Sequence, residues 1–173
     1  MFSNGVMLIL RLIHIGSGVV WAGGAITSAR FIEPAAKDAG DAGPRFMGAL
    51  IRTGFSTAMA ALGGLTFLSG AVMYWNDSNG FTNGWNQTGP GILITLGAIA
   101  GLTGLIVGGA MMSPAARRMQ QIGEEVAKGG GKPSPEQGAA IGQLSARLGL
   151  GGRITAVLLG IAVLCMAGAQ YAF

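Results

Sequence analysis

Four long apolar runs, separated by short polar segments, make up most of this chain. An α-helix needs about 20 apolar residues to cross a hydrocarbon core roughly 30 Å thick, and each run is close to that length or above it. The pattern predicts an all-α protein, a four-transmembrane-helix bundle that forms one membrane domain over residues 1–173. The expected spans lie at about residues 6–30, 53–75, 91–113 and 153–172.

The segment 114–152, between the third and fourth spans, predicts a helical hairpin. The third helix is expected to continue past its apolar part until the glycines and proline of 129–133 break it. Ser134 is a typical N-cap residue, and Pro135 suits the first position of a new helix. We expect this second arm to loosen at the glycines within 149–152 before the fourth span begins.

Glycines recur inside the third span at three- and four-residue spacing, which places them on one face of a helix. Such a stripe of small residues favours close packing against a neighbouring helix. The residues concerned are Gly97, Gly101, Gly104 and Gly108.

Charge predicts the orientation of the bundle. Ten of the eleven Lys and Arg residues lie in segments 30–53 and 114–153, and the loop 76–90 has none. By the positive-inside rule, the two basic segments and the helical hairpin face the cytoplasm, whereas both termini and that loop lie on the outer, periplasmic side of a bacterial inner membrane. Only 10% of residues are charged, against about 25% in soluble domains. The pI near 9.8 therefore indicates a lipid bilayer as partner, not nucleic acid.

The first span carries the chemistry that the sequence offers. Arg11, His14, Gly18 and Trp21 share one helical stripe, and ionisable groups inside a span are functional candidates. His14 lies about 12 Å into the span, and Arg11 is one turn nearer the outer surface. This arrangement suits a b-type haem, with His14 Nε2 as iron ligand, Arg11 paired with a propionate and Gly18 leaving space for a flat ligand.

Other interpretations stay open. His14 can instead hydrogen-bond to another helix, Arg11 can extend to the outer headgroups, and Trp21 can belong to the bundle core. Met166 lies at a similar depth in the fourth span and could complete a His/Met pair. His14, Cys165 and Met166 would equally suit copper, because Cu(I) prefers soft sulfur ligands. Cys165 and Met166 can also be packing residues.

These residues resemble those of a known group. The first span is similar to the opening of the copper-resistance-D-like membrane proteins and their relatives of unknown function. The shared features are a His near the start, a Trp and Gly pair one to two turns later and a Pro at the cytoplasmic end. In this chain they are His14, Trp21-Ala22-Gly23-Gly24 and Pro34, followed by Pro44-Arg45-Phe46 and Ser113-Pro114-Ala115-Ala116-Arg117-Arg118.

The chain also resembles, more distantly, the four-helix membrane protoporphyrinogen oxidases. Their first-span His would correspond to His14, but they also use an intramembrane Lys that spans two to four of this chain lack. The chain lacks that Lys and also has no phosphate-binding loop and no Ser/His/Asp set, so the sequence does not indicate an enzyme.

We expect a haem-associated or accessory subunit of a membrane redox and electron-transfer assembly. A copper-handling protein and a purely structural subunit are the alternatives, and other membrane subunits or a second copy are the expected partners.

Overall fold

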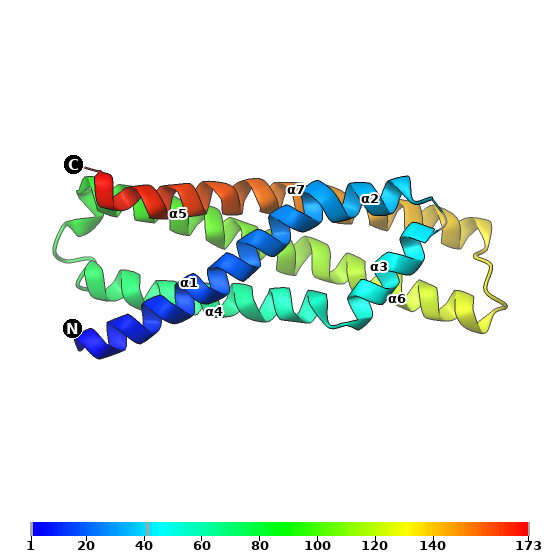
Figure 1. Ribbon diagram of the computed structural model, residues 1–173, viewed down its shortest axis with the longest axis horizontal. Coiled ribbons are helices and arrows are strands. Elements are labelled where there is room, and N and C mark those ends of the chain that lie inside the picture. Colours follow the sequence, from blue (N-terminus) through cyan, green and yellow to red (C-terminus); the bar gives the residue numbers. More distant parts are fainter. Residues whose placement is uncertain (1, 41, 173) are drawn as a thin grey trace.

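The computed structural model describes residues 2–40 and 42–172, and every regular element in this part of the chain is a helix (Figure 1). Consecutive elements form four long rods, each long and apolar enough to cross a membrane. This confirms the all-α class and the prediction of four helices that could span a membrane, among the described residues. The elements are α1 (Asn4–Thr27), η1 (Ser28–Ile32), α2 (Glu33–Asp38), α3 (Ala42–Arg52), α4 (Phe55–Asp77), η2 (Trp85–Gln87), α5 (Gly89–Ile106), η3 (Val107–Met112), α6 (Ser113–Lys128), α7 (Pro135–Gly168) and η4 (Ala169–Tyr171).

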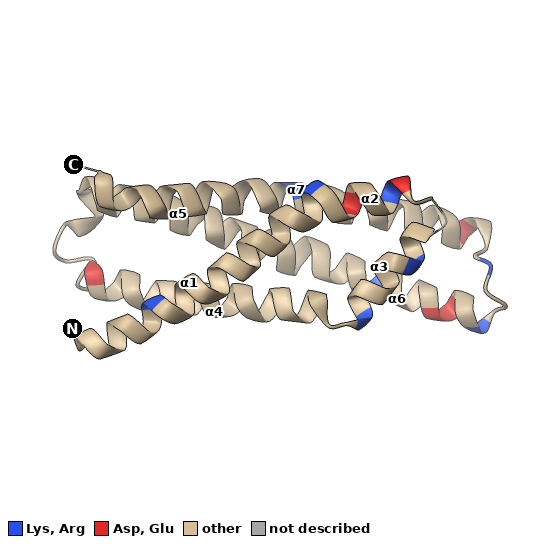
Figure 2. Ribbon diagram, in the orientation of Figure 1, with Lys and Arg blue, Asp and Glu red and all other residues tan. Residues whose placement is uncertain are grey.

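Charged side chains gather at one end of the bundle. Figure 2 shows most Lys, Arg, Asp and Glu residues around α2, α3 and the connection between α6 and α7, which we call the charged end. Both ends of the chain and the turn 78–88 lie at the opposite, terminal end (Figure 1). The charges at the terminal end are those of Arg11 and Asp77 among the described residues.

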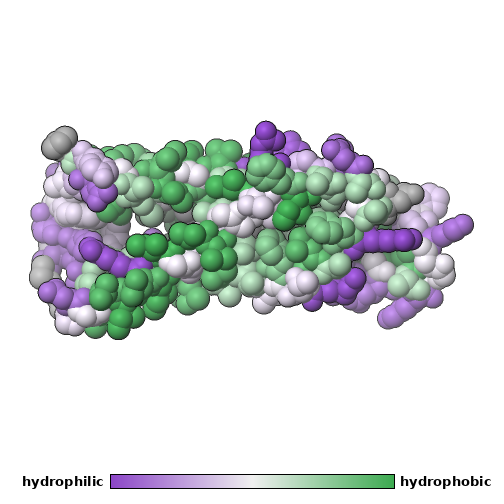
Figure 3. All heavy atoms as spheres, in the orientation of Figure 1, coloured by the Kyte–Doolittle hydropathy of each residue, from purple (hydrophilic) through white to green (hydrophobic). Residues whose placement is uncertain are grey.

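Large apolar side chains lie on the outside of the bundle. Leu12 is 64% exposed, Leu68 63% and Leu164 74%. In Figure 3 an apolar band occupies the middle of the molecule, with polar residues at its two ends. Water would disfavour so large an exposed apolar surface, whereas lipid tails are as apolar as these side chains.

Small residues form the contacts inside the bundle. Trp21 is 8% exposed and packs with Ala22 and Leu159 in the core. A Cβ added to Gly63 of α4 would lie 2.9 Å from Cε2 of Trp21, so only a glycine accommodates the indole here. Small residues allow such close helix contact where no hydrophobic effect drives association.

The most extensive packing joins α1 to α4 and α5 to α7, and α1 also contacts α7. On α5, a Cβ at Gly97 would lie 3.0 Å from Cγ of Met166, and one at Gly104 would lie 3.4 Å from Leu159. Gly101 and Gly108 face open space. The predicted close packing therefore holds for Gly97 and Gly104 and not for Gly101 and Gly108, of which Gly108 lies beyond α5, in η3.

The α6–α7 connection is a turn in which Gly130 and Gly131 have φ values of +99° and +83°. Ser134 caps α7 as predicted, since its hydroxyl accepts from the N–H of Gln137. The Gln137 side chain accepts from the Ser134 N–H in return, which completes a capping box.

The predicted loosening at 149–152 was wrong, because α7 runs without a break from Pro135 to Gly168. Its glycines make room for neighbouring side chains. A Cβ at Gly152 would lie 2.8 Å from Oε1 of Glu33, and one at Gly151 would lie 2.7 Å from Cγ of Met112. Tertiary packing thus overrides the weak helix propensity of these glycines.

Two π-helical turns occupy equivalent places in the two halves of the chain. In η1 the N–H of Glu33 bonds the carbonyl of Ser28, and in η3 the N–H of Ser113 bonds that of Gly108, each five residues back. A proline follows immediately in both cases. The sequence repeats there too, as Glu33-Pro34-Ala35-Ala36-Lys37 and Ser113-Pro114-Ala115-Ala116-Arg117. Proline lacks an N–H and crowds the preceding turn, so a widened turn before it relieves the clash.

Gly63 and Gly64 provide a matched test of the core. We expect Gly63→Ala to destabilise the detergent-solubilised protein by about 1–3 kcal/mol, because a methyl group there overpacks against Trp21. Gly64→Ala should be close to neutral, since nothing lies within 4 Å of the added Cβ. Thermal unfolding of both variants checks this, and equal losses would contradict the described contact between α1 and α4.

Candidate functional site around His14

One nitrogen of His14 is fixed by the neighbouring helix. Nδ1 of His14 lies 2.8 Å from the backbone carbonyl oxygen of Thr66 in α4. A carbonyl only accepts hydrogen bonds, so Nδ1 carries the proton and donates it. In the neutral imidazole, Nε2 is then the nitrogen with a free lone pair.

Gly70 allows this hydrogen bond to form. A Cβ at Gly70 would lie 2.7 Å from Cε1 of His14 and 2.9 Å from Nδ1. Real Cβ atoms do not approach that closely, so the ring lies directly against the α4 backbone because position 70 has no side chain. The imidazole is therefore held by a hydrogen bond and by packing together.

A second polar contact joins the same two helices one turn further along α1. Oγ of Ser17 lies 2.8 Å from Oγ1 of Thr66. Ser17 also contacts the carbonyl of Ile13 at 2.6 Å, and Thr66 contacts that of Leu62 at 2.8 Å. Each hydroxyl has one proton and two acceptor lone pairs, so one hydroxyl donates across the interface and the other to its own helix.

Nε2 of His14 has no hydrogen-bond partner among the described residues. Nε2 is not fully buried either. Among the described residues, the fully buried side-chain nitrogen or oxygen atom without a hydrogen-bond partner is Oγ of Ser28. His14 is half-buried, and its chain neighbours Ile13 and Ile15 are exposed. The imidazole is thus oriented through Nδ1 and offers Nε2 at the apolar surface. Histidines that bind metals are arranged in this way, with the other ring nitrogen donating to a carbonyl or carboxylate.

Arg11 lies one turn closer to the terminal end. It lines a hollow of about 400 Å³ with Asp77, Asn76 and residues of the first turns of α1. The N–H of Phe2 donates to Oδ1 of Asn76 at 2.9 Å, which ties the start of the chain to α4 beside this hollow. Arg11 is exposed and forms no ion pair within 4 Å in the described part of the chain.

Gly18 and Trp21 serve the packing of the bundle. A Cβ at Gly18 would lie 3.4 Å from the methyl group of Thr66, so a helix contact fills the space predicted for a flat ligand. Trp21 points into the core over Gly63. Of the residues on the predicted stripe, His14 and Arg11 therefore remain as groups for a ligand.

Cys165 and Met166 contact other parts of the bundle. Met166 packs against Gly97 of α5, and Cys165 is a half-buried free thiol. The contacts of His14 are with α4 instead. Across residues 2–40 and 42–172, no three His, Cys, Asp or Glu side chains gather into a metal-holding group. The contacts described for His14 and for Met166 are thus with different helices, α4 and α5.

Sequence reasoning missed Ser17, Thr66 and Gly70. Hydroxyl residues within apolar runs were the available signal, since Ser17 follows His14 by three residues. The pairing with Thr66 depends on the register of α1 against α4, which one sequence does not define.

No family model matches this chain, and neither a curated protein nor a solved structure was found to match it. The resemblance to the copper-resistance-D-like proteins therefore stays a prediction, and the site is argued from its own geometry.

Thr66→Val tests the polar contact between α1 and α4. We expect it to destabilise the protein by about 1 kcal/mol more than Thr103→Val, the order found for hydrogen bonds between membrane helices. Thr103 is an exposed residue of α5 whose hydroxyl bonds its own helix at Ile99, so its replacement controls for the intrahelical bond. The measurement is thermal unfolding in detergent, and losses of equal size would show that the Ser17–Thr66 contact adds nothing.

Proposed function

We propose that this chain is a multi-pass protein of a bacterial inner membrane that binds a b-type haem through His14 as a subunit of a membrane redox assembly. The observation that carries the proposal is the state of the imidazole. Nδ1 is anchored to a backbone carbonyl, and Nε2 is accessible inside an apolar span. His14 is also the only histidine of the chain.

The charge distribution supports the orientation within this proposal. Lys and Arg residues concentrate at the charged end, and the terminal end carries Arg11 alone among the described residues (Figure 2). The positive-inside rule then assigns the charged end to the cytoplasm and the terminal end to the periplasm.

The residues around His14 fit a haem only in part, and this indicates a shared site. His14 supplies an iron ligand, and Arg11 supplies a cation one turn nearer the periplasm for a propionate. The rest of the surrounding surface of α1 is apolar, with Leu12 and Ile15 exposed. Walls for a porphyrin must therefore come from a second copy or from a partner subunit. A haem held there would supply one-electron transfer, while this chain orients the ligand and excludes water.

The two alternatives differ in their support. The contact between His14 and Thr66 also holds α1 against α4, which favours a structural subunit as the second candidate. No observed contact supports copper handling in the same way, since the contacts described for His14 are with α4 and those for Met166 are with α5.

Absorption spectra of the purified protein test the haem. The wild-type protein should show a Soret band that sharpens on dithionite reduction, and His14→Ala should lose it because the iron ligand is gone. Added imidazole should restore the band in His14→Ala, which a purely structural role would not produce. Gly64→Ala is the control, since its Cβ meets open space, and it should keep the wild-type spectrum. A folded wild-type protein without a Soret band, even after addition of haemin, would contradict the proposal.

Cysteine labelling tests the orientation. In a Cys165→Ser background, Asn83→Cys in the turn 78–88 should react with a membrane-impermeant maleimide in spheroplasts. Lys132→Cys in the α6–α7 connection should react only after the membrane is permeabilised. The reverse pattern would show that the terminal end faces the cytoplasm.

A further inference from the structure

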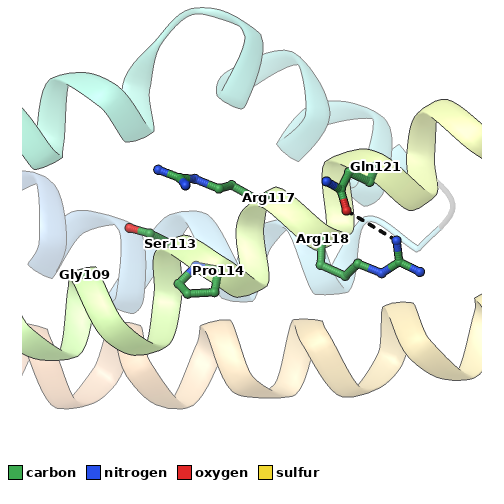
Figure 4. A pocket seen from close by; sticks show the side chains of 6 residues that line it. All are labelled: Gly109, Ser113, Pro114, Arg117, Arg118 and Gln121. Atoms are coloured by element: carbon green, nitrogen blue, oxygen red, sulfur yellow. Dashed lines mark hydrogen bonds between the residues drawn. The ribbon is translucent and has the colours of Figure 1, made fainter.

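A hollow of about 290 Å³ opens where the apolar helix α5 gives way to the charged helix α6. It lies along one stretch of chain, at the end of η3 and the first turns of α6. Gly109 contributes no side chain, and nothing lies within 4 Å of the Cβ position there. The residues that line it are Gly109, Ser113, Pro114, Arg117, Arg118 and Gln121 (Figure 4).

Two guanidinium groups belong to this hollow. Figure 4 shows the side chain of Arg117 extending back along the helix toward Ser113. Arg117 forms no ion pair within 4 Å in the described part of the chain. Arg118 donates to Oε1 of Gln121 at 3.3 Å and lies 3.6 Å from Glu125, in a pair whose side chains are 56% and 53% exposed. Exposed pairs of this kind contribute little, so Arg118 remains available to an anion.

An exposed apolar stripe leads to the same hollow. Ile99, Leu102 and Ile106 are 58%, 38% and 55% exposed on α5. Their three- and four-residue spacing places these three side chains on one face of α5, which ends at η3, where Gly109 begins the hollow. The surface therefore has apolar side chains along its length and positive charge at its end, which is the complement of an anionic lipid.

We infer that this surface binds an anionic glycerophospholipid, with the phosphodiester at Arg117 and Arg118 and an acyl chain along Ile99, Leu102 and Ile106. Guanidinium groups recognise phosphate through paired hydrogen bonds, and basic pockets beside membrane helices bind acidic headgroups on the cytoplasmic side. Two arginines suit a lipid with two phosphates, such as cardiolipin, better than one with a single charge. The inference uses the proposed membrane placement and is independent of the haem.

Thermal unfolding of delipidated protein in detergent tests this site. Micelles doped with cardiolipin or phosphatidylglycerol should stabilise the wild-type protein, and phosphatidylcholine should not. The double variant Arg117→Gln/Arg118→Gln should bind cardiolipin about 10- to 30-fold more weakly, because each cation near the membrane surface strengthens binding by roughly tenfold or less. Lys128→Gln/Lys132→Gln removes the same charge away from the hollow and should bind like wild type.

Equal cardiolipin binding by the two double variants and the wild type would overturn the inference. Stabilisation by inorganic phosphate as large as that by cardiolipin would assign the site to a free anion and overturn the lipid assignment. If the first double variant does not fold, Arg117→Gln alone gives the same comparison, with bound lipid counted by native mass spectrometry.

Discussion

The close antiparallel contact between α1 and α4 depends on two glycines of α4 that lie seven residues apart. Gly63 receives Trp21 and Gly70 receives His14, so each of the two large rings of α1 meets a position where α4 has no side chain. Thr66 lies between them and bonds Ser17. Because lipid supplies no hydrophobic force between helices, this contact relies on close approach and on interhelical hydrogen bonds. The orientation of His14, and with it the proposed ligand site, follows from that register.

The second half of the chain repeats the architecture without the chemistry. α5 packs on α7 through Gly97 and Gly104, and the same widened turn and proline follow in both halves. The two copies of the sequence repeat are 80 residues apart, so Ile94 has the position in the second half that His14 has in the first. One half thus carries the imidazole and its hydroxyl contacts, and the other packs Met166, Leu159 and Thr155 of α7 against glycines of α5. We interpret this asymmetry as the separation of a ligand-holding hairpin from a supporting one.

The four spans and the cap at Ser134 could be predicted from the sequence, because hydropathy and capping depend on neighbours in the chain. His14 and Arg11 could be identified as candidates because ionisable groups in apolar runs are unusual. The sequence left Trp21 open between a ligand site and the bundle core, and it did not predict the contact of Gly18 with Thr66, since both roles depend on what α4 places opposite them. The predicted loosening at 149–152 was wrong for the same reason. Glycines alone weaken a helix, but here their lack of a side chain leaves space for Glu33 and Met112. The partner of Nδ1 required the register, which only the structure supplies.

The state of the imidazole is the central claim, and the single histidine makes it directly measurable. Protein labelled with ¹⁵N-histidine gives one pair of imidazole nitrogen signals in a nuclear magnetic resonance spectrum. The structure predicts a proton on Nδ1 that is hydrogen-bonded to a carbonyl, so that in the neutral ring Nε2 is the unprotonated nitrogen. A proton on Nε2 with a bare Nδ1 would contradict the anchoring of His14 to Thr66, and the haem proposal would lose its foundation.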